Sequence, residues 1–415
     1  MTGTSRPDIA TALDAWIDSH FDDEVAFLRE LVRVPTDTPP GDNARPAEQA
    51  AELLGAMGFT VERHAPPTDA VRAAGLVSIV NLVVRHRFGR GGPVIALNAH
   101  GDVVPPGGGW TRPPYGGEID DGRIYGRGVA VSKSDFATYA FALRALKESG
   151  VALNGSIELH LTYDEEFGGL LGPAWLLSQK ITEPDLAICA GFSYAIVNAH
   201  DGCLQLAVTI RGRAAHAAMP ETGVDALKAA VVVMQALYDD AKRLAELRSK
   251  TAGIESPTLN IGRIEGGINT NVVPDSVTFK LDRRMIPEED PDTVEASLRT
   301  LIDAALPKRS GLSIAVRRLL LARALMPLPG HERLVEALSK SASEVFGETI
   351  TTTGTPLYTD ARLYCEAGVP TVSYGAGPRS ILEANAKRAD ENLVLEDLRR
   401  ATQAVARALA ALLGV

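Results

Sequence analysis

The sequence predicts an α/β protein in which a mixed sheet covered by helices is interrupted by a smaller βαββαβ unit. Helical and strand-like patterns alternate in the first and last parts of the chain, and an unbroken βαββαβ series fills its middle. At 415 residues the chain also exceeds the size at which a single hydrophobic core usually stops growing. We therefore expect two domains, a discontinuous one formed by residues 1–202 and 326–415 and an inserted one formed by residues 203–325.

The first part of the chain starts with helical patterns. Apolar residues recur at helical spacing from Ile9 to Val32 until Pro35 ends the pattern, and a second helix is expected after the Pro39-Pro40-Gly41 turn. Short β-rich runs follow at residues 60–62, 77–84 and 94–97. This alternation favours a sheet with helices on both faces.

The middle of the chain gives the pattern of a ferredoxin-like unit. Between Cys203 and about Leu325 the expected segments are, in order, CLQLAVTIRG, VDALKAAVVVMQALYDDAKRL, TLNIGRI, SVTFKLDRR, DTVEASLRTLIDAAL and SIAVRRLLL. This strand-helix-strand, strand-helix-strand order is typical of such units. Beyond Pro327 the alternation resumes and ends with a long helix at residues 395–413.

Composition excludes several classes of partner. The formal charge of −10 argues against a general affinity for nucleic acid or anionic membranes. The sequence contains no signal-peptide pattern and no run of 18 apolar residues, so we expect a cytoplasmic protein. Its three cysteines lack metal-ligand spacing and are expected to be buried, reduced thiols.

Two strand patterns end in residues that can carry chemistry. His100 and Asp102 follow the apolar run at 94–97, and three consecutive acids follow the run at 157–161: Asp164, Glu165 and Glu166. Strand ends are common positions for reactive side chains in α/β enzymes. An acidic triple on a loop is usually only solvated, but this one ends an apolar strand and precedes Gly168-Gly169, which favours an active-site position.

These segments resemble the zinc amidohydrolase/peptidase family of acetylornithine deacetylase, succinyl-diaminopimelate desuccinylase, aminoacylase and glutamate carboxypeptidase. The resemblance rests on six segments in family order: HGDVVPPGGGW, GRGVAVSK, TYDEEFGG, RAAHAAMPETG, GGINTNVVPD and LDRRMIP. It implies that residues 1–202 and 326–415 form a catalytic domain and that residues 203–325 form a lid and dimerisation domain.

The resemblance also implies a site for two zinc ions held by five protein ligands, of which this chain keeps two. His100 and Glu166 stand at ligand positions. The positions of the bridging Asp, the outer carboxylate and the last His are occupied by Val131, Gly191 and Lys387. Relative to the family pattern, the site thus lacks two carboxylates and has one additional cation. A site without metal ions requires such a change in net charge, because unpaired carboxylates in a cleft are costly.

No cofactor is therefore predicted, although a single zinc, cobalt or manganese ion remains open. Such an ion would need a third protein ligand, for which His200, Asp164 and Asp135 are candidates. Val131, Ser132 and Lys133 lie just before a strong helical pattern that starts at Asp135, and N–H groups at a helix start favour an anion. Two interpretations of Val131 remain: a substrate oxygen or carboxylate binds beside it, or its side chain only fills the space.

The resemblance assigns roles to the retained residues. It implies that Glu165 is the general base and that Asp102 orients His100. His216 would reach from the lid into the opposite subunit's active site and stabilise an oxyanion. We predict that Lys387 supplies the positive charge that zinc gives elsewhere, or donates a proton if burial lowers its pKa.

Two further residues are expected to bind substrate. Asn271 in TNVVP and Arg284 in DRRMIP match family residues that hold a substrate carboxylate. The planar fork of an Arg side chain suits a carboxylate. An Arg on a strand is otherwise a solvated residue, and this alternative remains open.

The sequence thus predicts a peptidase- or deacylase-like enzyme acting on a small, carboxylate-bearing N-acyl amino acid or dipeptide-like substrate. The reaction would be amide hydrolysis or proton abstraction next to a carbonyl, without the usual two-zinc centre. The alternatives are a non-catalytic small-molecule binding protein on the same fold and a one-metal amidohydrolase. A homodimer formed through the lid domain is expected, because the role implied for His216 lies in the neighbouring subunit.

Overall fold

The computed structural model describes residues 9–414, which form two compact units. Unit 1 contains the chain up to Asn198, residues Pro327–Thr353 and the part from Thr359 onward. Unit 2 contains Ala199–Met326 together with the short segment Gly354–Tyr358. Main-chain hydrogen bonds attach this segment to unit 2, because Asp201 N donates to Thr355 O and Gly354 N donates to Ala252 O.

Unit 1 is built on an eight-stranded mixed sheet with the order β1-β2-β6-β3-β7-β14-β8-β13. The strands are β1 Val61–His64, β2 Asn81–Arg87, β3 Val94–His100, β6 Ser156–Thr162, β7 Leu186–Cys189, β8 Ile196–His200, β13 Thr352–Thr355 and β14 Thr371–Ser373. The central strand β3 runs parallel to β6 and to β7, while β2 pairs antiparallel with β6. Parallel strands β3 and β6 therefore end at the same edge of the sheet.

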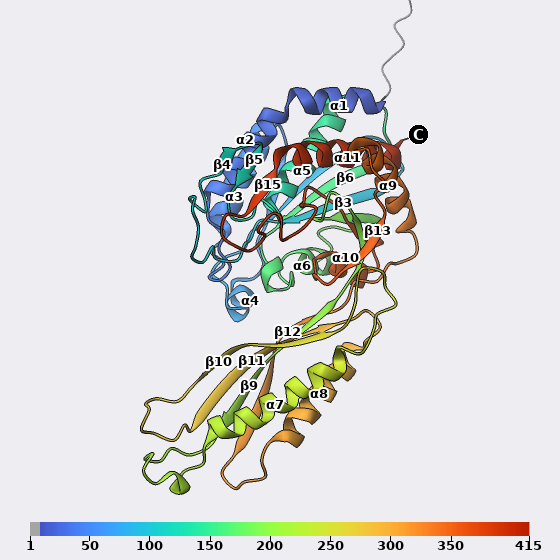
Figure 1. The fold of residues 1–415 in the computed structure, drawn as a ribbon. Helices are drawn as coiled ribbons and strands as arrows, with labels where there is room; N and C mark the ends of the chain where they lie inside the picture. Colours follow the sequence, from blue (N-terminus) through green and yellow to red (C-terminus); the bar gives the residue numbers. More distant parts are fainter. Residues whose placement is uncertain (1–8, 415) are drawn as a thin grey trace, which may run out of the picture. The chain divides into compact units, whose positions relative to one another are not determined.

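Helices cover both faces of this sheet, as the sequence predicts. One face carries α1 Ile9–Ser19, α2 Phe21–Arg33, α5 Lys133–Glu148, α9 Glu332–Phe346 and α11 Leu395–Leu413 (Figure 1). The short helices α6 Pro173–Ser178 and α10 Ala361–Glu366 lie on the other face. Two more helices, α3 Ala44–Ala56 and α4 Thr68–Ala73, precede β1 and β2 in the chain. The fold class is confirmed, although β2 begins at Asn81 rather than at residue 77.

A small three-stranded antiparallel sheet lies beside the main one and has the order β15-β5-β4. Its strands are β4 Glu118–Asp120, β5 Arg123–Tyr125 and β15 Asn392–Val394. The chain leaves β5 directly into the GRGVAVSK segment and enters β15 directly from the segment that contains Lys387. The small sheet therefore brings together two segments that are far apart in the sequence.

Unit 2 has the element order β9 Gly202–Arg211, α7 Ala226–Leu244, β10 Thr258–Gly266, β11 Ser276–Met285, α8 Pro291–Ala305 and β12 Ser313–Ala322. Its sheet has the order β10-β11-β9-β12, and every neighbouring pair is antiparallel, as in a ferredoxin-like unit. Buried and half-buried residues alternate along β11, because only one face of the sheet packs against α7 and α8. Each helix starts at an Asp whose side chain accepts a main-chain hydrogen bond, Asp225 in α7 and Asp290 in α8.

Candidate active site

The C-terminal end of β3 places His100 in the interior of unit 1. His100 is the last residue of the strand, pairs with Thr162 of β6 and is 6% exposed. Its Nδ1 lies 3.0 Å from the main-chain oxygen of Asp102 and 3.4 Å from Asp102 Oδ1. A carbonyl oxygen only accepts, so Nδ1 carries a proton, and the other nitrogen, Nε2, lies 3.8 Å from Glu165 Oε2.

Asp102 connects the two strand ends. Its buried carboxylate accepts hydrogen bonds from the main-chain N–H groups of Glu165, at 3.3 Å, and Glu166, at 2.9 Å. These donors belong to the short 3₁₀ turn Glu165–Phe167 that follows β6. The structure thus brings together His100, Asp102, Glu165 and Glu166, all of which the sequence places in the candidate site.

Several buried carboxyl groups surround Glu165. Burial raises the pKa of Glu165, and the nearby Glu166 acts in the same direction, while His100 and Lys387 oppose the shift. Burial also raises the pKa of Asp164 to about 7. Burial, Glu165 and Asp164 raise the pKa of Asp360 well above its usual range. Closely spaced acids hinder one another's ionisation, which adds to the effect of burial in raising these pKa values.

Asp360 is a member of this cluster that sequence reasoning missed. It is 4% exposed and directly precedes α10, and a Cβ added to Gly169 would collide with its carboxylate. No strand pattern ends at Asp360, and nearly two hundred residues separate it from Glu165. The available signal was an acid directly before a helix, which by itself indicates only a helix start.

The carboxylates around His100 stabilise its charged form. Burial alone would lower its pKa, but Glu165 and Asp102 outweigh that effect and raise the pKa of His100 to about 10. These carboxylates therefore favour the cationic form of His100, next to the candidate base.

Lys387 adds a second cation to the site. Its Nζ lies 2.7 Å from Glu166 Oε2, and the Glu166 side chain is 9% exposed. The alternative that Lys387 donates a proton depends on a pKa lowered by burial, and the shift has the opposite direction. Desolvation alone would lower the pKa of Lys387, but Glu166 and Glu165 together raise it. The carboxylates thus favour the ammonium form of Lys387, which is paired with Glu166.

The residues that the family resemblance places at zinc-ligand positions do not fit a two-zinc centre. Lys387 presents an ammonium group where a metal ligand must present a lone pair. Gly191 leaves no room for a side chain, because a Cβ there would lie 2.7 Å from the main-chain atoms Ser373 C and Tyr374 N. Val131 has no donor atom. Within residues 9–414, no group of three or more His, Cys, Asp or Glu side chains is arranged to hold a metal ion.

The three candidate third ligands make other contacts. His200 belongs to unit 2, and its Nδ1 lies 2.9 Å from Asp201 O. Asp164 Oδ2 accepts a hydrogen bond from Leu171 N at 2.6 Å. Asp135 Oδ1 accepts from Ala376 N at 2.7 Å, and burial raises the pKa of Asp135 to about 7.

Unit 2 carries the three other residues that the sequence singles out. His216 and Asn271 lie on neighbouring segments, joined by a hydrogen bond of 2.9 Å from Ala217 N to Asn271 O. His216 is exposed, and its Nδ1 accepts a hydrogen bond from Ala218 N at 3.1 Å, so Nε2 carries the ring proton. Arg284 lies on β11, where Nε donates to Asp282 Oδ1 at 2.7 Å and the guanidinium stacks over the Tyr358 ring. Unit 2 therefore presents an imidazole N–H donor and a guanidinium group.

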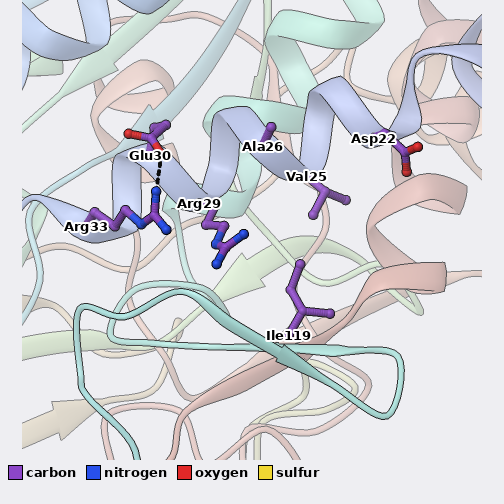
Figure 2. Close-up of a pocket in the computed structure, with 7 residues that line it drawn as sticks. All are labelled: Asp22, Val25, Ala26, Arg29, Glu30, Arg33 and Ile119. Carbon is purple, nitrogen blue, oxygen red and sulfur yellow. Dashed lines mark hydrogen bonds and ion pairs between the residues drawn. The ribbon is translucent and has the colours of Figure 1, made fainter.

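A separate cavity of about 280 Å³ lies between α2 and β4 (Figure 2). It is lined by Asp22, Val25, Ala26, Arg29, Glu30, Arg33 and Ile119. Arg33 pairs with Glu30 at 2.5 Å. None of the predicted site residues lines this cavity, so it is not part of the candidate active site.

No helix within residues 9–414 is both long enough and apolar enough to cross a membrane.

Comparison with known proteins gives a consistent family assignment. Residues 96–411 match the description "Peptidase family M20/M25/M40". The succinyl-diaminopimelate desuccinylase of Methylobacterium nodulans is 30% identical over 398 residues, which cover 93% of this chain and 95% of that protein. The dipeptidase Dug1p from Saccharomyces cerevisiae has a similar structure, with a TM-score of 0.80, 15% identity and coverage of 97% of this chain and 98% of that chain.

An M20 family metallo-carboxypeptidase from Sulfolobus solfataricus also shares the fold. Its TM-score is 0.76 at 19% identity, with 93% of this chain and 98% of that chain covered. The fold resemblance therefore extends over nearly all of both chains, and the family match includes His100, Glu165, Glu166 and Lys387 within its range. The chain belongs to peptidase family M20/M25/M40, a family of peptidases and related hydrolases.

Proposed function

We propose that the protein hydrolyses small, carboxylate-bearing N-acyl amino acids or dipeptide-like amides in an active site that works without a two-zinc centre. The observation that carries this proposal is the ion pair of 2.7 Å between Lys387 Nζ and Glu166 Oε2. It puts a fixed cation on a carboxylate at a position where the family's zinc ligands are expected. The charge that a metal would supply is then supplied by the chain itself.

Glu165 is the general base in this proposal. Burial raises the pKa of Glu165, which makes its carboxylate a stronger base than an exposed one. It accepts a proton from water while the water oxygen bonds to the amide carbon. The protonated Glu165 then donates that proton to the amide nitrogen as the C–N bond breaks, which gives a carboxylic acid and an amine.

Cations stabilise the negative charge that develops on the carbonyl oxygen. His100 and Lys387 provide positive charge in unit 1, because nearby carboxylates raise the pKa of both side chains. We assign a further hydrogen-bond donor to His216 of the neighbouring subunit, as the family resemblance implies, because its Nε2 carries the ring proton. Removing one such donor typically costs about 10²–10³ in turnover in acyl-transfer enzymes.

The substrate carboxylate is assigned to Arg284 and Asn271. Within residues 9–414, Arg284 uses Nε for Asp282 and Nη1 for a weak contact of 3.4 Å to Pro356 O, which leaves Nη2 for a ligand. One relative is named a succinyl-diaminopimelate desuccinylase, and one similar structure is that of a dipeptidase. Both names support a substrate that combines an amide with a carboxylate.

Proton abstraction next to a carbonyl is the second candidate reaction. The same buried Glu165 beside two cations could carry this reaction. Without a metal, a carboxylate activates water only weakly, which favours proton abstraction over hydrolysis. Abstraction needs a base and a stabiliser for the oxyanion, and it needs no water.

Isotope labelling tests both candidates. The purified protein is incubated in H₂¹⁸O with N-succinyl-diaminopimelate, N-acetyl amino acids and dipeptides, and products are analysed by mass spectrometry. Hydrolysis places one ¹⁸O in the released acid. A parallel reaction in D₂O that gives deuterium on carbon without cleavage would replace hydrolysis by proton abstraction, and binding without either product would contradict catalysis.

A further inference from the structure

A single buried carboxylate joins the two altered segments of the candidate site. Glu391 is 2% exposed and directly precedes β15. Its Oε1 accepts hydrogen bonds from Gly128 N at 2.9 Å and from Ala130 N at 3.1 Å. Its Oε2 accepts from Lys387 N at 3.2 Å and is paired with Arg127. One side chain therefore contacts the main chain directly before Val131 and the main chain of Lys387.

The main chain around Lys387 requires such support. Lys387 has a φ of +60°, and Asn385 and Asp390 have φ values of +50° and +55°. Residues with a Cβ rarely adopt this left-handed conformation, because it crowds the Cβ against the following carbonyl. Such conformations persist where surrounding contacts determine them. The hydrogen bond from Lys387 N to Glu391 is one of these contacts and acts at the residue that carries the ammonium group.

Arg127 is the ionic partner of Glu391 in the interior: burial raises the pKa of Glu391, and the Arg127 guanidinium opposes that shift. Arg127 is 1% exposed, donates from Nη2 to Pro106 O at 3.1 Å, and stacks over the Trp110 ring at 5.2 Å. A buried carboxylate without such a partner would be unstable or would become protonated. Replacing Glu391 by Gln would introduce an NH₂ group that faces N–H donors, so at least one of these hydrogen bonds must be lost.

We propose that Glu391 is a positioning residue: its carboxylate fixes the Lys387 main chain relative to the Gly128–Ala130 segment and so holds the Lys387 ammonium on Glu166. This inference rests on the proposed function, in which Lys387 stabilises developing negative charge. Glu391 itself does not contact the reacting atoms in this account. Its effect on turnover must therefore pass through Lys387.

Hydrogen exchange tests the positioning role without an activity assay. Glu391→Gln is expected to increase amide exchange by at least tenfold in two peptides at once, one covering residues 127–131 and one covering residues 385–391. The control is Glu383→Gln, which removes an exposed carboxylate that pairs with Arg123 at 3.4 Å in the same part of the chain. Unchanged exchange in either peptide would overturn the inference, whatever the protein catalyses.

A double-mutant cycle tests the link to Lys387. Glu391→Gln should lower kcat about tenfold with KM within twofold, and it should cause no further loss in a Lys387→Ala background. Equal losses in both backgrounds would show that Glu391 acts independently of Lys387. If Lys387→Ala alone keeps full turnover, the proposed function fails, while the exchange experiment still decides the positioning role. If Glu391→Gln does not fold, Glu391→Asp replaces it, with a smaller increase in exchange expected in both peptides.

Discussion

The strand ends and the loop at residues 385–391 contribute to the same candidate site by different means. At the strand ends, hydrogen bonding between β3 and β6 fixes the main chain, and His100 and Glu166 are the residues that the family resemblance expects. In the loop, a left-handed main chain is held by the Glu391 carboxylate, and Lys387 replaces the expected His. Glu391 can therefore keep the loop geometry while the side chain at residue 387 differs in its chemistry.

The largest expected effect comes from the strand end. Replacing Glu165 by Gln removes the base while keeping the size of the side chain, so kcat should fall about 10²–10⁴-fold. Steady-state kinetics measure this loss. Glu183→Gln serves as the control, because Glu183 is an exposed acid that pairs with Lys180 at 3.8 Å. Full activity of Glu165→Gln would show that the strand end does not carry the chemistry.

The loop should show a smaller effect on turnover. Lys387→Ala removes the cation from Glu166 and should lower kcat about 10–10²-fold with little change in folding stability, since the Lys387 side chain is 61% exposed. Lys180→Ala is the matched control, because it removes another exposed ammonium group. A loss confined to KM would place Lys387 in substrate binding rather than in stabilising the oxyanion.

A third prediction concerns the position of the missing outer carboxylate. Gly191→Ala should destabilise the protein by about 1–3 kcal/mol, because a Cβ there collides with the main chain of Ser373 and Tyr374. Gly55→Ala is the control: a Cβ at Gly55 meets no atom within 4 Å, and alanine favours the helix α3. Urea unfolding measures both. Equal stability of Gly191→Ala and the parent protein would mean that a side chain can be accommodated there.

The smallest effect comes from Glu24, a buried acid outside the candidate site. Burial raises the pKa of Glu24 to about 8, against a hydrogen bond of 2.6 Å from Thr402. The folded state thus binds a proton more tightly than the unfolded state, so this contribution to stability decreases as pH rises from about 4.5 to about 8.

Glu24→Gln should remove this part of the pH dependence. Between pH 7 and 9 the parent protein should lose about 1–2 kcal/mol of stability that the variant retains. Urea unfolding at both pH values measures the difference. Parallel losses in the two proteins would show that the Glu24 pKa is not raised. Glu48→Gln is a control, because Arg63 lowers the pKa of the exposed Glu48 by hydrogen bonding.

Sequence reasoning predicted the parts of the site that follow from periodic patterns. The apolar runs before His100 and Asp164 locate two strand ends, and parallel pairing places these ends together. The βαββαβ order of unit 2 also follows from pattern alone. The roles of Asp360 and Glu391 could not be predicted, because they depend on contacts between segments 195 to 263 residues apart in the chain. The assignment of the segment Gly354–Tyr358 to unit 2 could not be predicted either, because it too depends on contacts between distant segments.

The central claim is that charged side chains of this chain take the place of a two-zinc centre. Elemental analysis of the purified protein, combined with turnover measured before and after chelation, tests it most directly. The account predicts well under one equivalent of zinc, cobalt or manganese per chain and unchanged kcat in the presence of chelator. Two equivalents of zinc that are required for turnover would contradict it, and one tightly bound, essential ion would replace it by a one-metal amidohydrolase.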